Sequence, residues 1–153
     1  MGYTHYWTDF GGDRDLPALA VTQIKQVTDE AFLQGLIQRD WDDARAPLVT
    51  PREVRFNGVV EQGHQTFRYS TARRDALGYC KTERKPYDAT VMRVLLILGY
   101  HREGLEISSD GEFQVEWAEA LAWCNREIGA AYVKSQLSYW RPIQAPALGI
   151  LDF

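Results

Sequence analysis

The fold is decided by the stretch Cys80-Lys81-Thr82-Glu83-Arg84-Lys85-Pro86-Tyr87-Asp88, a charged and rigid entry into the most apolar part of the chain. From Tyr87 to about Arg102 almost no side of the segment is polar, because it contains Val91, Met92, Val94, Leu95, Leu96, Ile97 and Leu98. Apolar residues on every side predict a helix that is buried nearly all round. We expect it to be the central helix of the fold.

The start of this helix has the features of an anion site. Proline is favoured at the first helical position, so we expect the helix to begin at about Pro86. The free amides and the positive end of the helix dipole would then face the same side as Lys81, Arg84 and Lys85. A buried helix also holds its N-terminus still, as a pre-organised site requires.

The charge distribution supports this interpretation. From Arg68 to Arg93 there are seven Lys or Arg residues and three Asp or Glu residues, a local balance of +4 in a protein of net charge −4. The alternative is a solvated loop whose charges only keep it soluble. The negative total argues against binding of long nucleic acids.

The composition indicates one soluble domain in a reducing compartment. With 153 residues and 45% hydrophobic content, we expect one globular domain over 1–153. No apolar run is long enough for a membrane span, and a secretion signal is not evident, so we expect a cytoplasmic location and no membrane partner. Cys80 and Cys124 lack Cys-x-x-Cys spacing and predict no disulfide.

The N-terminal half alternates between strand and helix patterns. Residue types alternate over Gly2 to Trp7, which predicts a strand. Apolar spacings of three and four predict a helix from Leu16 to about Arg39, followed by a loop from Trp41 to Pro51. Two short paired strands are expected at 54–58 and 65–69, and 71–78 looks irregular or briefly helical.

The C-terminal half adds a strand, a helix and a tail. Alternation predicts a strand at 105–108, and Ser109 with Glu112 matches a capping box that would open a third helix at Phe113. Residues 134–153 form an extended apolar tail, which we expect to dock on its own domain or on a second copy in a homo-oligomer. The resulting class is α+β: a small, mostly antiparallel sheet of about four strands, three main helices and a docked tail.

Signals for catalysis are sparse. The three histidines, His5, His64 and His101, stand alone without zinc-site spacing, so we expect no metal and no cofactor. Cations near Cys80 would lower a thiol pKa, but no partner for it is placed by the sequence. His64 begins a single His-x-Thr element of the kind that two-histidine phosphodiesterases use twice, and the second element is missing.

Recognition of a phosphorylated ligand is the coherent alternative. Lys81, Arg84 and Lys85 suit phosphate, and an aromatic ring of Tyr3, Trp7 or Tyr87 suits a base. Asp88 and Asp110 can accept from ribose or base donors, although Asp88 can equally complement the dipole of its own helix. Tyr3, His5 and Trp7 share one face of the expected strand. This face either lines a cleft or belongs to the core.

Several motifs also carry a resemblance to a known family. They are Met1-Gly2-Tyr3-Thr4-His5-Tyr6-Trp7, Phe56-Asn57-Gly58, Gly63-His64 with Phe67, Cys80-Lys81-Thr82 with Arg84-Lys85-Pro86-Tyr87-Asp88, and Ser108-Ser109-Asp110-Gly111. On these motifs the chain resembles a poorly characterised family of small proteins of tailed phages, prophages and some bacteria. The resemblance implies no reaction. It suggests a phage setting, in which small soluble proteins often act on host defence, sometimes by sequestering a nucleotide signal.

We therefore expect a binding protein for a small phosphorylated, nucleotide-like ligand, such as a sponge for an immune signal in the host cytoplasm. One alternative is a phosphodiesterase or other nucleotide hydrolase with His64 as general acid and base. Another is an inhibitor of a host protein, acting through the aromatic tail and the acidic third helix. The candidate ligand-binding residues are Tyr3, His5, Trp7, Asn57, His64, Lys81, Thr82, Arg84, Lys85, Tyr87, Asp88, Ser109 and Asp110.

Overall fold

The computed structural model describes residues 2–72, 77–112 and 114–129. Within these ranges the chain forms three α-helices and seven strands in two antiparallel sheets, which confirms the predicted α+β class. The predicted tail, 134–153, lies outside the described residues. No helix in the described part of the chain has the length and apolar character that a membrane crossing needs.

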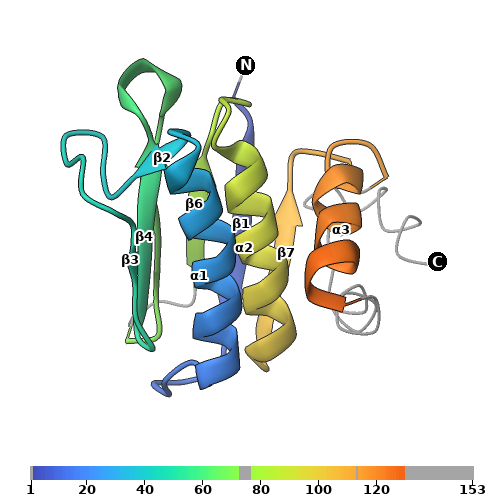
Figure 1. The fold of residues 1–153 in the computed structure, drawn as a ribbon. Coiled ribbons are helices and arrows are strands. Elements are labelled where there is room, and N and C mark those ends of the chain that lie inside the picture. The colour runs from blue at the N-terminus through green and yellow to red at the C-terminus, as the bar shows by residue number, and fades with distance from the viewer. Residues whose placement is uncertain (1, 73–76, 113, 130–153) are drawn as a thin grey trace.

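The first sheet has three strands, with β1 (Thr4–Asp9) between β6 (Leu77–Lys81) and β7 (Leu105–Ser109). Both neighbours run antiparallel to β1, and His5 lies opposite Cys80 on one side and Ser109 on the other. The start of β1 therefore lies beside the ends of β6 and β7. That end of the sheet is also where α2 begins (Figure 1).

The second sheet is built on β4 (Glu53–Gly58), which pairs with β2 (Ile37–Gln38), β3 (Leu48–Val49) and β5 (Phe67–Ser70). A short 3₁₀ turn, η1 (Val60–Gln62), lies in the connection from β4 to β5. The pairing of β4 with β5 confirms the predicted strand pair. The connection itself, 59–66, reaches the same end of the molecule as the start of β1.

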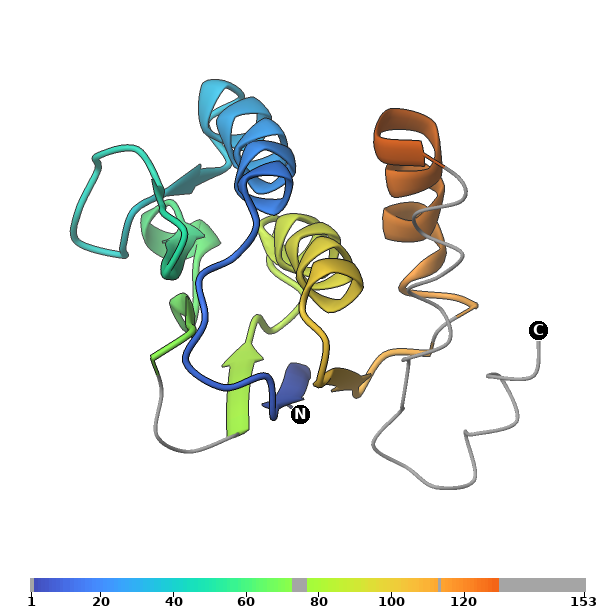
Figure 2. The same cartoon turned by 90° about the horizontal axis from the view of Figure 1, so that it is seen from below.

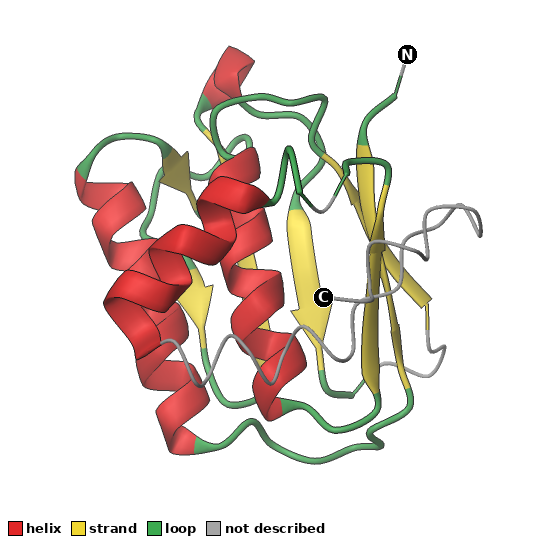
Figure 3. Cartoon of the chain, turned by 90° about the vertical axis from the view of Figure 1, so that its right-hand side faces the viewer, coloured by secondary structure: helices red, strands yellow, loops and turns green. Residues whose placement is uncertain are grey.

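The helices pack on one side of the first sheet. Figure 2 shows α2 (Asp88–His101) directly over that sheet, with α1 (Ala18–Leu33) and α3 (Ala118–Cys124) on either side. A π-helical turn, η2 (Asn125–Gly129), continues α3. Nine of the 14 residues of α2 are buried, which confirms a central helix. No described helix or strand lies over the other face of the sheet, as Figures 2 and 3 show.

The core lies between the helices and the inner face of the first sheet. Trp7 is 2% exposed and its ring contacts Phe67 of the second sheet, with ring centroids 5.2 Å apart. Gly78 leaves room for that ring, because a Cβ at this position would lie 2.2 Å from it. Tyr3, His5 and Trp7 are all buried, so this strand face belongs to the core and does not line a cleft.

The structure corrects several predicted boundaries. The first helix ends at Leu33 rather than about Arg39, since Gly35 with φ +74° turns the chain into β2. The central helix begins at Asp88, two residues after Pro86. Strand β6 begins at Leu77, within the segment 71–78 that we expected to be irregular or briefly helical, and it includes the first residues of the charged stretch. The strands number seven in two sheets, rather than about four in one.

The predicted capping box is also wrong. The third helix begins at Ala118, well after Phe113, so Ser109 is not its N-cap. The hydroxyl of Ser109 has two other partners, the amide of Gly111 and the ring of His5. Tertiary contacts thus determine the role of this serine.

Candidate functional site

The structure brings most of the candidate residues to one end of the first sheet, but it divides them into two groups. One group is a buried hydrogen-bond network around His5. The other lies around an exposed pocket beside β6, with His64 and Lys81 in its lining. The two groups have different chemical abilities.

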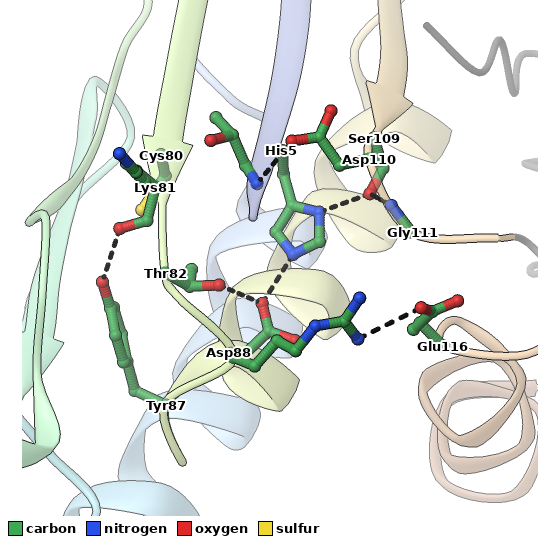
Figure 4. Close-up of polar contacts among 12 residues, drawn as sticks. His5, Cys80, Lys81, Thr82, Tyr87, Asp88, Ser109, Asp110, Gly111 and Glu116 are labelled. Carbon is green, nitrogen blue, oxygen red and sulfur yellow. Dashed lines mark hydrogen bonds and ion pairs between the residues drawn. The ribbon is translucent and has the colours of Figure 1, made fainter. Parts of the chain in front are cut away.

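The buried network joins four segments of the chain (Figure 4). His5 is fully buried, and its Nε2 lies 2.6 Å from Oδ1 of Asp88 while its Nδ1 lies 2.8 Å from Oγ of Ser109. The hydroxyl of Thr82 donates to the same Asp88 oxygen at 2.6 Å, and the Gly111 amide donates to Ser109 at 2.9 Å. With hydrogen on Nε2 of a neutral imidazole, all of these groups are satisfied.

A serine, a histidine and an aspartate in a row are also the components of a nucleophilic triad. However, Ser109 is 1% exposed and His5 is 0% exposed, so a substrate has no access to either. We conclude that the network is structural: it ties β1, β7, the β6–α2 loop and the start of α2 together.

Asp88 fills the position that the sequence suggested for an external anion. Its carboxylate lies in the first turn of α2, where a negative charge complements the helix dipole. The Asp88 amide donates to the carbonyl of Lys85 at 2.9 Å. The favourable end of the helix therefore already faces a carboxylate of its own chain.

The three cations expected to gather there point to different partners. The guanidinium of Arg84 lies 4.0 Å above the ring of Tyr3 and 3.1 Å from Glu116, two residues before α3. Burial opposes ionisation of Glu116, but the Glu112 amide and Arg84 hold the pKa of its carboxyl below the ordinary value. Arg84 thus belongs to the contact between the β6–α2 loop and the chain before α3.

Lys85 and Lys81 have different side-chain partners. Nζ of Lys85 donates to the carbonyl of Glu61 at 3.0 Å. Nζ of Lys81 lies 3.7 Å from Glu83, a pair with a half-exposed ammonium. Lys85 therefore contacts the β4–β5 connection, and Lys81 lines the same pocket as His64.

A pocket of about 340 Å³ opens between this connection and β6, lined by His64, Gln65, Tyr79 and Lys81. It provides an imidazole, an amide, a phenol ring and an ammonium group. The ring of Tyr79 is exposed, at 58%. These groups can donate to an anion and stack on a planar ring.

Hydrogen bonds to Gln65 hold one wall of the pocket in place. Its side-chain oxygen accepts from the backbone amide of Lys81 at 2.7 Å, and its backbone amide donates to the Lys81 carbonyl at 3.1 Å. The buried hydroxyl of Tyr87 donates to the Gln65 carbonyl at 2.6 Å. Lys81 and the residue beside His64 are thus fixed relative to each other.

Asn57 holds the other end of the same loop. Its fully buried amide donates to the His64 carbonyl at 3.1 Å and accepts from the His64 amide at 3.2 Å. Gly63 passes so close that a Cβ there would lie 2.6 Å from the Asn57 oxygen. Asn57 therefore positions the backbone of His64, and its own side chain does not reach the pocket.

The remaining candidates lie close to the network. Asp110 pairs with the start of β1, since its carboxylate accepts from the Thr4 amide at 3.1 Å. Burial raises the pKa of the Cys80 thiol to about 12, which weighs against a thiolate nucleophile at neutral pH.

Gln65 and Tyr79 are the pocket residues that sequence reasoning missed. Tyr79 stands two residues before Lys81, a spacing that places both side chains on one face of a strand. That signal was present, but it required 77–81 to be recognised as a strand. Gln65 had no local signal, because its partners are 16 and 22 residues away.

The described residues contain no cluster of three or more His, Cys, Asp or Glu side chains that would hold a metal ion. Comparison with known proteins finds no family model, no curated protein and no solved structure that matches the chain.

Proposed function

We propose that this protein binds a small phosphorylated, nucleotide-like ligand in the pocket between His64 and Lys81, and that it sequesters the ligand intact. The observation that carries the proposal is the combination in one pocket of two groups able to hold phosphate with the exposed ring of Tyr79. An ammonium group makes charge-assisted hydrogen bonds to phosphate oxygens, and an imidazole N–H can donate to them as well. The volume lies at the lower end of the range for small-molecule sites.

Backbone strain beside the pocket adds support. The described non-glycine residues with positive φ are Val60 at 48°, Glu83 at 54° and Arg84 at 58°. They lie in the two connections that flank the pocket, which the Lys85–Glu61 hydrogen bond joins. Such conformations cost free energy and concentrate at ligand sites.

The resemblance to a phage family contributes only the setting that it suggests. Of the residues in its motifs, His64 and Lys81 line the pocket. A sponge for a nucleotide signal of host defence is the role that this setting favours.

A nucleotide hydrolase is the second candidate. It is favoured by the exposed side chain of His64 beside Lys81, since an accessible imidazole can serve as general acid or base next to a phosphate-binding cation. The two candidates share the pocket and differ in the fate of the ligand.

A thermal-shift screen tests the proposal. The library contains cyclic di- and trinucleotides, ADP-ribose derivatives and common nucleotides, and each hit is recovered by chromatography after heat denaturation. Ligand at 100 times its Kd adds about 2.7 kcal/mol to the free energy of unfolding. For a chain of this size that raises the Tm by roughly 5–11 °C.

Two matched variants locate the site. Lys81→Glu reverses a charge in the pocket, and Lys25→Glu makes the same change on the exposed face of α1. We expect Lys81→Glu to abolish the shift and Lys25→Glu to retain it. An intact ligand supports a sponge, whereas products that disappear in His64→Ala support the hydrolase. Equal shifts in both lysine variants would refute this site.

A further inference from the structure

A second pocket of about 290 Å³ lies on the outer face of the first sheet. Its lining includes Tyr6, Thr8, Leu77, Glu106 and Ser108, which come from all three strands. Leu77 is 64% exposed. In Figure 2 this face is opposite α2, and no described element covers it.

The two pockets are neighbours on one surface. Tyr6 lies directly opposite Tyr79 in the pairing of β1 with β6, and directly opposite Ser108 in the pairing with β7. Residues directly opposite in an antiparallel pair have their side chains on the same face, with Cβ atoms about 5 Å apart. Tyr79 lines the first pocket and Tyr6 lines the second, so two adjacent tyrosines connect them.

Charge differs between the two ends of this surface. The first pocket carries Lys81 and His64, whereas the charged side chain in the lining of the second is the carboxylate of Glu106. A carboxylate repels phosphate but accepts hydrogen bonds from base N–H groups. Among the bases, guanine presents two neighbouring N–H donors on its Watson–Crick edge, which match the two oxygens of one carboxylate.

We propose that the ligand is a dinucleotide, with phosphate at Lys81 and His64, one base on Tyr79, and a second base, guanine, on Tyr6 with its edge toward Glu106. This inference rests on the proposed function, since it assigns a class to the ligand of that site. The hydroxyls of Thr8 and Ser108 provide further hydrogen-bonding groups around the second base.

Titration calorimetry on the full chain tests this assignment with two probes, the linear dinucleotide pGpG and the mononucleotide GMP. Stacking and edge recognition of a second base should make pGpG bind at least about tenfold more tightly than GMP. Tyr6→Thr removes the ring and keeps a residue suited to a strand, and Glu106→Gln keeps the shape without the charge. Each should weaken pGpG by roughly tenfold and leave GMP unchanged.

The outcomes separate the two proposals. In one outcome, both probes bind the wild type, Lys81→Glu loses this binding, and Tyr6→Thr and Glu106→Gln keep it unchanged. That result would overturn the second base site and leave the proposed function standing. Equal affinity of the wild type for pGpG and GMP would also overturn the second base site. Failure of the wild type to bind either probe would overturn the dinucleotide assignment, while the wider screen still decides the proposed function. Circular dichroism melts confirm that each variant is folded.

Discussion

Replacement of Asp88 tests whether the buried network holds the fold together. Oδ1 of Asp88 is 2.6 Å from the His5 ring and 2.6 Å from the Thr82 hydroxyl, and both of those residues are fully buried. Asp88→Ala leaves two buried donors without an acceptor. An unsatisfied buried donor costs about 1–3 kcal/mol, so we expect a total loss of roughly 3 kcal/mol.

In a chain of 153 residues each kcal/mol lowers the Tm by about 2–4 °C. Asp88→Ala should therefore melt roughly 6–12 °C below the wild type, as measured by circular dichroism. Urea unfolding should show the same loss with an unchanged m-value. Asp88→Asn keeps an oxygen acceptor and should lose less.

The matched control is Asp29→Ala, which removes a carboxylate from the exposed face of α1. A surface change of this kind usually alters the free energy of unfolding by no more than about 0.5 kcal/mol. Equal melting temperatures for Asp88→Ala and Asp29→Ala would refute the structural role of the network. If Asp88→Ala does not fold, Thr82→Val removes one of the two hydrogen bonds and should cost about 1 kcal/mol.

Three further changes test other parts of the structure. Gly78→Val should prevent folding, because the Cβ of the new valine would overlap the Trp7 ring. Circular dichroism checks this, and a soluble variant with the melting curve of the wild type would contradict the packing of Trp7 against Gly78. Val60→Asn should raise the free energy of unfolding by about 1 kcal/mol, since asparagine tolerates the positive φ better than a branched residue. A lower free energy of unfolding in a urea titration would contradict backbone strain at Val60. Burial opposes ionisation of Asp40, but its hydrogen bond from Thr66 and nearby charges hold its pKa below the ordinary value of 3.8. The ionised carboxylate therefore stabilises the fold above pH 3.8, and this stabilisation is lost as the pH falls through the lower pKa of the folded state. Asp40→Asn should make the free energy of unfolding depend less on pH in that range. Identical acid unfolding curves for the variant and the wild type would show that Asp40 makes no such contribution.

The parts of the fold that local sequence could predict are those whose pattern is strong within one element. The apolar run from Val91 to Leu98 predicted the buried central helix, and alternation before Trp7 predicted β1. The short strands β2 and β3 have two residues each and depend on pairing with β4, so no local pattern marks them.

The candidate site was harder to predict for a physical reason. The motif residues do meet at one end of the sheet, but burial decides their roles, and burial depends on tertiary packing. His5 and Asp88 satisfy each other's hydrogen-bonding groups inside the protein, and nothing in the local sequence shows that His5 is buried against Asp88. The pocket depends on the approach of Gln65 to Lys81, a contact between residues 16 positions apart.

The most direct test of the central claim is an NMR titration of the ¹⁵N-labelled protein with the tightest nucleotide found in the screen. We predict that the backbone amides of Gln65, Tyr79 and Lys81 shift first and together, while those of α1 stay in place. Loss of these shifts in Lys81→Glu would complete the assignment. Shifts confined to another surface, or none at saturating nucleotide, would contradict a ligand site between His64 and Lys81.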